Sequence, residues 1–164
     1  MDKLLPLNKG LFAIVDEADF EELSKWKWHA HWSASKQAYY VRRRVRIGGG
    51  KRKHIFLHRQ LMCALSGLDV DHKNGNPLDN RRENLRICTR SQNSYNRGPQ
   101  RDNTSGYKGV KWNKANSRWS SNIGVNGKRV FLGYFLDKKD AAAAYDRAAA
   151  LHHGEFAQPN KVAA

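Results

Sequence analysis

The sequence predicts an α+β fold made of small antiparallel sheets and short helices. Tryptophans alternate with other residues from Trp26 to Trp32, the period-two pattern of a strand. Asn126-Gly127 lies between two strand-like runs and is the pair favoured in a tight hairpin turn. An alanine-rich segment, 141–150, precedes Gly154, as expected of a helix and its stop. We expect a small antiparallel N-terminal sheet, then two short strands and a helix, and finally a three-stranded antiparallel sheet packed on one helix.

Charge indicates the kind of partner. The 164 residues, enough for one or two small domains, include 30 Lys and Arg against 15 Asp and Glu, a net charge of +15. Nine of these cations lie between Lys36 and Gln60, where there is no acidic residue. The pattern is typical of a surface that binds the phosphates of nucleic acid, although a solvated edge hairpin also carries such charge. No apolar run is long enough to span a membrane, and two isolated cysteines are too few for a disulfide framework. We expect a cytoplasmic protein that does not bind membranes.

The N-terminal elements follow from the same patterns. Acidic residues after a short apolar strand predict a helix that begins near Asp16 and ends near Ser24. Leu61, Met62 and Leu65 lie on one face of a further predicted helix. The predicted strands are a short apolar run at 11–15 and the segments 26–32, 39–47 and 53–57, and the predicted helix is 58–65.

The middle of the chain combines two short strands with a loop. Val70–His72 ends the first strand, and the loop 73–83 is rich in Asn, Gly, Pro and Asp. A second strand, 84–89, precedes a helix that begins near residues 89–91. Neighbours on a strand point to opposite faces, so Asp71 and His72 can share a site only where the strand ends or twists.

The last part, 106–160, follows a polar linker, 97–105. A two-residue turn at Asn126-Gly127 gives the hairpin a core face and a polar face. The core face is expected to pair Ile123 with Val130, Ser121 with Leu132, and Trp119 with Tyr134. The polar face then carries Arg118, Asn122, Arg129 and Phe131. Asp137 is the expected cap of the following helix.

Three sequence motifs in the middle part of the chain together resemble those of the HNH endonucleases, and most closely those of the phage and intron-encoded homing branch. They are Val70-Asp71-His72-Lys73-Asn74-Gly75-Asn76, Asn80-Arg81-Arg82-Glu83-Asn84-Leu85-Arg86 and Ser91-Gln92-Asn93. The alternative is a turn-rich surface loop whose Asp and Asn side chains bond their own backbone. The resemblance implies a ββα-metal core at about 66–96, inside a domain that spans 1–96.

The resemblance also implies the catalytic roles. His72 would be the general base that deprotonates water, and Asp71 and Asn93 would hold one divalent cation, Mg²⁺ or Mn²⁺. Asn84 would tether the loop and orient His72. Asn96 is a second-ranked alternative to Asn93. His54 and His58 lie four residues apart but straddle an element boundary, which favours packing or phosphate contact over a metal site.

Segments from Gly106-Tyr-Lys-Gly-Val-Lys-Trp112 to Gly127–Phe135 and Ala142–Asp146 resemble the Apetala-two/ethylene-response-factor DNA-binding domain. That family lays a three-stranded sheet in the major groove. Matching its pattern implies DNA contacts by Lys108, Gly109, Lys111, Asn122, Arg129 and Phe131, together with Gly124 and Tyr134. The expected register places Tyr134 on the opposite face from Asn122, which makes it the least consistent of these positions.

The expected function is a metal-dependent DNA endonuclease of the homing type that nicks one strand. Its partner would be double-stranded DNA, bound also by Arg42, Arg43, Arg44 and Arg46, with no obligate protein partner and a monomeric chain. The alternative is a noncatalytic, sequence-specific DNA-binding regulator whose HNH unit is structural. The usual aromatic signatures of single-strand RNA modules are absent from the sequence, so an RNA-binding accessory role is the weaker third option.

Overall fold

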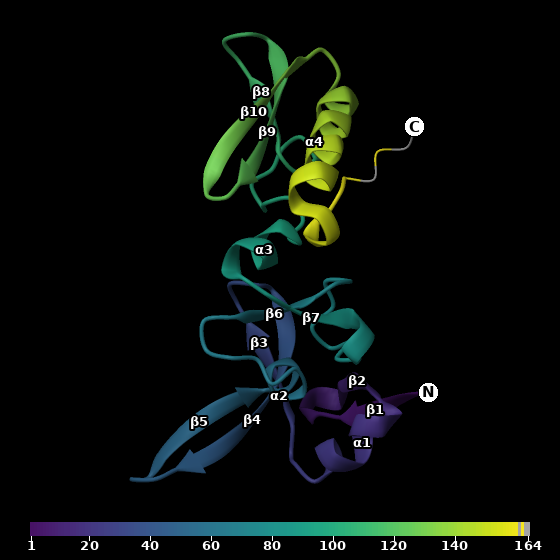
Figure 1. The fold of residues 1–164 in the computed structure, drawn as a ribbon, viewed down its shortest axis with the longest axis vertical. Coiled ribbons are helices and arrows are strands. Elements are labelled where there is room, and N and C mark those ends of the chain that lie inside the picture. The colour runs from purple at the N-terminus through teal and green to yellow at the C-terminus, as the bar shows by residue number, and fades with distance from the viewer. Residues whose placement is uncertain (161, 163–164) are drawn as a thin grey trace. The chain divides into compact units, whose positions relative to one another are not determined.

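The computed structural model describes residues 1–160 and 162. Contacts divide the chain into two compact units, with the division after Thr89 (Figure 1). Both units combine helices with small antiparallel sheets, which confirms the α+β class.

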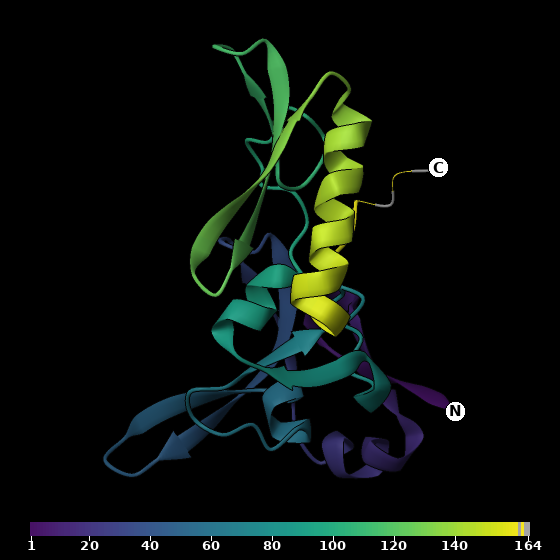
Figure 2. The ribbon, with the colours of Figure 1, turned by 45° about the horizontal axis from the view of Figure 1, so that its top comes forward.

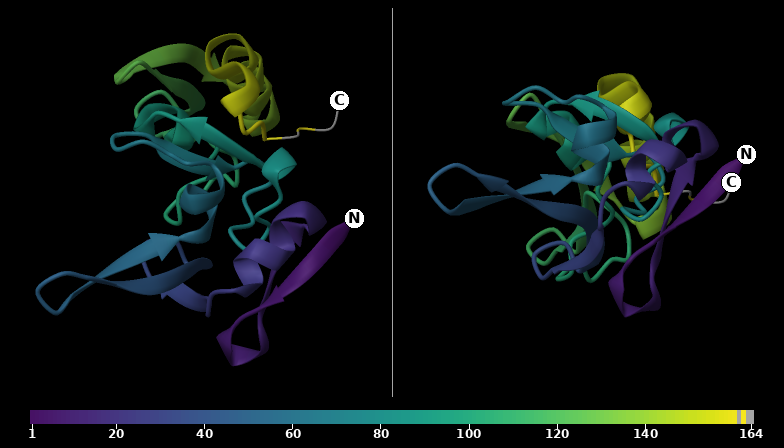
Figure 3. Two further views of the ribbon diagram at one scale, coloured as in Figure 1. Left: turned by 60° about the horizontal axis from the view of Figure 1, so that its bottom comes forward. Right: turned by 90° about the horizontal axis from the view of Figure 1, so that it is seen from below.

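The first unit contains three small antiparallel sheets, β1-β2, β3-β4-β5 and β6-β7. Hairpin β4–β5 extends well beyond the rest of this unit (Figure 3). The elements are β1 (Asp2–Pro6), β2 (Phe12–Asp16), α1 (Glu17–Ser24), β3 (His29–Ser33), β4 (Ala38–Ile47), β5 (Lys51–Phe56), α2 (Leu57–Leu61), β6 (Asp69–His72) and β7 (Leu85–Cys88).

One apolar core joins these elements, with buried residues from both helices and most of the strands, among them Val15, Leu23, Val41 and Leu57. Strand β3 begins at His29, later than the tryptophan alternation predicts, and Trp28 just before it is buried in this core. Its indole Nε1 donates to the Leu23 carbonyl at 2.9 Å.

The loop between β6 and β7 is fixed to strand β2. The Ile14 amide donates to the Leu78 carbonyl at 2.8 Å, and the Asn80 amide donates to the Ile14 carbonyl at 2.7 Å. These bonds satisfy backbone groups of the loop where Asp79 and Asn80 are buried, and the loop ends in a short 3-10 helix, Arg82–Asn84.

The second unit is a three-stranded sheet covered by one long helix, preceded by a short helix. Its elements are α3 (Arg90–Tyr95), β8 (Val110–Asn113), β9 (Arg118–Val125), β10 (Lys128–Phe135) and α4 (Lys138–His153). The sheet order is β10-β9-β8, and α4 lies along the sheet (Figure 2). Small side chains such as Ala141 and Ala149 allow close packing of α4, and the Asp137 cap is confirmed by its bond to the Lys139 amide at 2.5 Å.

A β-bulge changes the predicted register of hairpin β9–β10. Val130 pairs with Ile123 as predicted, but the register shifts between Phe131 and Gly133. The predicted pairs Ser121–Leu132 and Trp119–Tyr134 are therefore wrong: Gly133 pairs with Ser121 and Phe135 with Trp119. One extra residue on β10 reverses the alternation beyond the bulge, so Tyr134 pairs with Ser120 and joins the face of Asn122.

The contacts of α3 group it with the second unit, whereas the sequence-based boundary at 96 places it with the first. Within the described residues, no helix combines the length and the apolar character needed to cross a bilayer.

Candidate active site and nucleic-acid interface

Asp71 and His72 are the last two residues of β6. The strand ends at His72 because the chain turns there, and the Gly75 amide donates back to the His72 carbonyl at 2.8 Å. Gly75 has a φ of 75°, which favours glycine at this turn. Both side chains are buried.

The His72 ring contacts aromatic residues from two other elements of the first unit. Its centroid lies 5.1 Å from that of His58 on α2 and 6.4 Å from that of Tyr40 on β4. Burial lowers the pKa of His72 below 6.5, although a hydrogen bond with Asn80 and the nearby Asp71 and Asp79 oppose that shift. The imidazole is therefore neutral at pH 7, the form that a general base needs.

His58 is a packing residue beside His72. Its ring stacks on Phe56 at a centroid distance of 5.5 Å. Burial, together with His72 and Arg59, lowers the pKa of His58 to about 3, so this ring is also neutral.

Asp71 pairs with an arginine on the neighbouring strand. The Arg86 guanidinium donates to Asp71 Oδ2 from Nη2 at 2.7 Å and from Nε at 2.9 Å. Both side chains are nearly enclosed, with exposed fractions of 7% and 10%. The sequence pattern does not predict a site role for Arg86, and the pairing of β6 with β7 puts it directly opposite Asp71.

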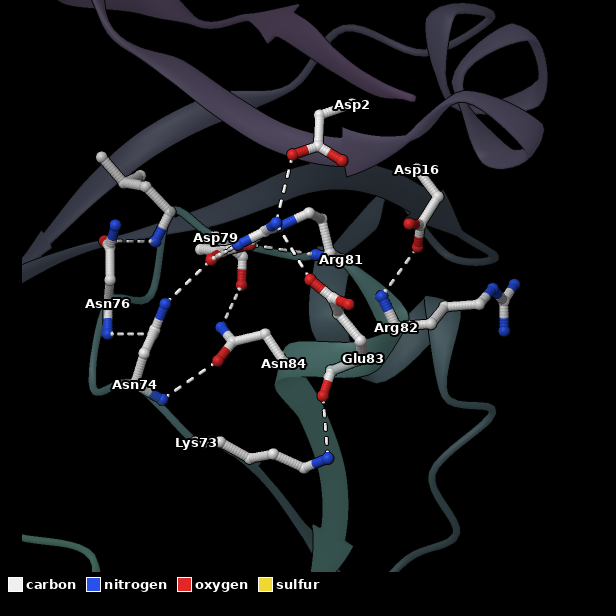
Figure 4. A network of polar contacts seen from close by, with 11 residues as sticks. Asp2, Asp16, Lys73, Asn74, Asn76, Asp79, Arg81, Arg82, Glu83 and Asn84 are labelled. Carbon is white, nitrogen blue, oxygen red and sulfur yellow. Dashed lines mark hydrogen bonds and ion pairs between the residues drawn. The ribbon is translucent and has the colours of Figure 1, made fainter.

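Asn84 ties the ends of the β6–β7 loop together (Figure 4). Its Oδ1 accepts from the Asn74 amide at 3.0 Å, and its Nδ2 donates to the Asp79 carbonyl at 2.8 Å. These hydrogen bonds are consistent with the predicted role of Asn84 in tethering the loop, and its role in orienting His72 stays a prediction.

A buried carboxylate organises the rest of this loop. Asp79 accepts from the Arg81 guanidinium at 2.7 and 2.8 Å and from Asn74 Nδ2 at 2.8 Å (Figure 4). The hydrogen bond from Arg81 is the main cause that lowers the pKa of Asp79. Asn74 and Asn76 also accept from backbone amides two residues on, as side chains in tight turns do.

Cationic side chains gather on one face of the β3-β4-β5 sheet. Residues paired directly across strands share a face, and the register pairs His29 with Arg42, Arg44 with His54, and Arg46 with Arg52. A groove of about 580 Å³ lies here, and its lining includes His29, His31, Arg42, Arg44, Arg46, Arg52 and His54. We call this surface the cationic face. His29 and His31 are not predicted site residues, and the pairing of β3 with β4 places them on the same face as the arginines.

Arg43 differs from its neighbours because it points to the opposite face of β4. Its guanidinium carbon lies 4.0 Å from the Trp26 ring centroid, and its Nε donates to Gln60 at 3.1 Å. These contacts hold Arg43 against Trp26 and Gln60, although Arg43 also lines the groove, and DNA contact by Arg43 stays a prediction.

On the second unit, the sheet face away from α4 carries most of the predicted DNA contacts. Asn122 pairs with Phe131, and Gly124 pairs with Arg129. Phe131 and Tyr134 are 53% and 44% exposed, and their ring centroids lie 4.8 Å apart. The exposed aromatic pair arises from the β-bulge.

Lys108 and Gly109 have other contacts in the structure. Lys108 Nζ donates to the Tyr95 carbonyl at 2.5 Å, and burial lowers the pKa of Lys108 to about 8. Gly109 has a φ of 77°, and a Cβ there would lie 2.2 Å from the Tyr145 ring and 2.6 Å from the Asn122 carbonyl oxygen. Glycine is therefore required by packing, and DNA contact by either residue stays a prediction.

Asn93 lies on α3, so the predicted metal pair Asp71 and Asn93 is divided between the two units and stays a prediction. Among residues 1–160 and 162, no cluster of three or more His, Cys, Asp or Glu side chains is arranged to hold a metal ion. A carboxylate and an amide oxygen fit Mg²⁺, which commonly takes one or two protein ligands and completes its shell with water and substrate phosphate.

Comparison with known proteins agrees with this site. The HNH endonuclease family matches residues 66–95, which contain β6, the loop and β7. The chain is 30% identical over 161 residues to an "Uncharacterized HNH endonuclease" of Acanthamoeba polyphaga mimivirus, and the match covers 97% of this chain and 80% of the relative. The chain therefore belongs to the HNH endonucleases, and it is a nuclease.

Two further relatives match shorter stretches. Protein 3.8 of Escherichia phage T7 is 38% identical over 63 residues, covering 38% of this chain and 52% of the phage protein. The AP2-like ethylene-responsive transcription factor TOE2 of Arabidopsis thaliana is 46% identical over 66 residues, covering 40% of this chain and 13% of the plant protein.

Proposed function

We propose that this chain is a metal-dependent DNA endonuclease of the homing type that nicks one strand of a duplex. In this proposal, the ββα-metal core spans about residues 66–96, and residues 106–160 form an Apetala-two-like domain that selects the DNA site. The observation that carries the proposal is the contact of the His72 ring with Tyr40, which lies on the strand that carries Arg42, Arg44 and Arg46.

Tyr40 makes that contact. It lies on β4 two residues before Arg42 and therefore on the same sheet face. Its ring centroid is 6.4 Å from those of both His72 and Phe56. A phosphate backbone that follows Arg46, Arg44 and Arg42 along β4 would thus be led toward His72.

The reaction needs a deprotonated water and neutralised charge on the phosphate. Neutral His72 accepts the proton of the attacking water at an imidazole nitrogen. Asp71 and Asn93 would hold one Mg²⁺ or Mn²⁺ ion, which when bound supplies charge neutralisation at the phosphate and the leaving oxygen. Asn84 keeps the loop after His72 closed, and Arg86 keeps the Asp71 carboxylate in one orientation.

The second unit would recognise the site through its exposed sheet face. Asn122, Arg129 and Phe131 lie on that face, and we add Tyr134 because the bulge brings it there. The resemblance to plant transcription factors supports double-stranded DNA as the partner. Arginine is suited to reading guanine edges, so Arg129 is the proposed base contact, with Lys111 at a phosphate.

Supercoiled plasmid incubated with the protein and Mg²⁺ tests the proposed activity. We expect nicked circles to appear before linear DNA, and a chelator to prevent both. Binding without metal-dependent cleavage would instead favour a noncatalytic regulator. Linear DNA that forms without a nicked precursor would contradict the nicking proposal. Mapping the cuts on a random-sequence duplex then reveals whether the protein selects a site.

The role of the cationic face is tested with a matched pair of variants in hairpin β4–β5. Arg44→Ala removes an exposed cation on that face, whereas Lys53→Ala removes one from the opposite face of the same hairpin. A single phosphate contact contributes about 0.9 to the slope of log affinity against log salt. We expect Arg44→Ala to weaken duplex binding and lower that slope by about this amount, with Lys53→Ala close to wild type. Equal losses would mean that net charge, and not the face, governs binding.

A further inference from the structure

Asn80 is a fully buried polar side chain in the loop that follows His72, with an exposed fraction of 0%. Two hydrogen bonds fix it. Its backbone amide donates to the Ile14 carbonyl at 2.7 Å, and its side-chain Nδ2 donates to the Pro77 carbonyl at 3.1 Å. Because the nitrogen of the carboxamide is directed to Pro77, the orientation of its oxygen is fixed as well.

The oxygen of Asn80 faces the imidazole of His72. Burial lowers the pKa of His72, and a hydrogen bond with the Asn80 side chain is the largest effect that opposes this lowering. A partner that favours the protonated ring must accept from it, because a protonated imidazole has donors only. Asn80 therefore contacts His72 through Oδ1.

The geometry of this contact is looser than that of a standard hydrogen bond. Within the described part of the chain, Asn80 Oδ1 accepts no hydrogen bond of normal length and angle, and no other partner competes for it. Catalytic hydrogen bonds are often long or poorly aligned before the substrate binds, and they tighten in the complex. The buried oxygen is thus available to the ring of His72.

Asn84, the residue predicted to orient His72, is directed elsewhere. Its Oδ1 accepts from the Asn74 amide and its Nδ2 donates to the Asp79 carbonyl, at 3.0 and 2.8 Å (Figure 4). Its own carbonyl accepts from the Lys73 amide at 2.8 Å. These bonds hold the backbone of the loop, and they leave the direct contact with the imidazole to Asn80.

The aromatic neighbours of His72 cannot replace that contact. The rings of His58 and Tyr40 lie 5.1 and 6.4 Å from the His72 ring, both with edge-to-face geometry. Such contacts restrict the plane of an imidazole, but they do not select which of its two nitrogens carries the hydrogen. A hydrogen bond with an acceptor does make that selection.

We infer that Asn80 is a positioning residue for His72, which holds one ring nitrogen as the donor and leaves the other as the acceptor of the water proton. The inference rests on the proposed function, in which His72 is the general base. A neutral imidazole has one donor and one acceptor nitrogen. Asn80 would therefore fix both the tautomer and the rotation of the ring, and the bonds to Ile14 and Pro77 would fix Asn80.

Two variants of the full chain test the inference. Asn80→Leu removes Oδ1 but keeps a side chain of similar size. Leu78→Ala is the matched control, because Leu78 lies in the same loop and packs on the core of the first unit, and its loss leaves the Asn80 carboxamide in place. Long-range ¹H–¹⁵N NMR spectra report the tautomer of His72, with its signals assigned from the His72→Gln variant. Single-turnover nicking of supercoiled plasmid in Mg²⁺ measures the rate, and urea unfolding shows that each variant is folded.

In the wild-type protein we expect one His72 tautomer with a slowly exchanging ring N–H. In Asn80→Leu both tautomers should appear, and nicking should slow by at least about 10-fold, less than or equal to the 10²- to 10⁴-fold that a general base contributes. Duplex binding should change by less than about twofold. Leu78→Ala should lose stability but keep the wild-type tautomer and rate. A mixture of tautomers in the wild-type protein, or nicking at the wild-type rate by Asn80→Leu, would overturn the inference.

A double variant separates positioning from a general structural role. If Asn80 acts through His72, adding Asn80→Leu to His72→Ala should lower the residual nicking rate by less than about twofold, because residues that act as a unit have non-additive effects. A further loss equal to that of Asn80→Leu alone would mean that Asn80 supports the fold and not the base, and would contradict the inference.

Failure of the proposed function gives a different result. Nicking at the wild-type rate by His72→Ala would exclude His72 as the base, and the positioning of a base by Asn80 would be overturned with it. The tautomer of His72 is measured without DNA or metal, so those spectra would still show whether Asn80 holds the ring.

Discussion

Replacing His72 with alanine is expected to lower the rate of metal-dependent DNA cleavage by at least about 10²-fold, because removal of a general base commonly costs about 10²- to 10⁴-fold. The imidazole is buried at the end of β6, where burial keeps its pKa below 6.5 and the ring neutral. Single-turnover nicking of supercoiled plasmid measures the loss. Duplex binding should remain near wild type, because the arginines of the cationic face are unchanged.

Two further variants separate chemistry from damage to the fold. His72→Gln fills most of the cavity that alanine leaves against Tyr40 and His58, and it should be as inactive as His72→Ala. His152→Ala removes an exposed histidine of the second unit and should cleave normally. Cleavage at the wild-type rate by both His72 variants would exclude His72 as the base.

Replacing Arg86 with methionine is expected to destabilise the first unit by about 3–5 kcal/mol, the usual cost of removing one partner of a buried ion pair. The substitution leaves the Asp71 carboxylate without the guanidinium that contacts it at 2.7 and 2.9 Å. Urea unfolding in the presence of a chelator measures this loss. If Asp71 is a metal ligand, Mg²⁺ should restore part of the stability, and by more than it stabilises the wild-type protein, because the ion supplies the missing positive charge.

Arg59→Met is the matched control for that experiment. The Arg59 guanidinium is also partly buried, but its partners are backbone carbonyls, including that of Leu68 at 2.6 Å. Its loss should destabilise the protein without any recovery in Mg²⁺. Equal recovery in both variants, or none in Arg86→Met, would contradict metal binding at Asp71.

Local patterns in the sequence predicted most elements of the fold. Helix α1, the hairpin turn at Asn126-Gly127 and the Asp137 cap all depend on neighbouring residues, and the structure confirms them. Strand β1 is not predicted by the sequence pattern. It is stabilised by pairing with β2 and by the packing of Leu5 in the core, and both contacts involve other segments of the chain. The bulge in β10 was also missed, because an extra residue in a strand leaves no clear mark in hydrophobic alternation.

For the site, the resemblance to the HNH endonucleases predicted Asp71, His72 and Asn84, which the structure places on one hairpin and its loop, and their catalytic roles stay predictions. It did not identify Arg86, Tyr40 or the contacts of Arg43 with Trp26 and Gln60. Arg43 looks equivalent to Arg42 and Arg44 in the sequence, and only strand pairing separates it from them. The Tyr95 ring stacks on the ring of His153, which is 58 positions away in the chain, and a pattern of neighbouring residues cannot predict such a contact.

The alternation along β4 has a consequence for how this nuclease can change in evolution. An insertion of two residues lengthens a strand by about 6.6 Å and leaves every arginine on the same face of the sheet. Paired insertions or deletions in both strands, two residues at a time, would lengthen or shorten this hairpin, which we propose binds along a duplex, and would keep its arginines on the same face. A shift of one residue would turn Arg43 outward and its cationic neighbours inward, so the length of this hairpin is expected to vary among relatives only in even steps.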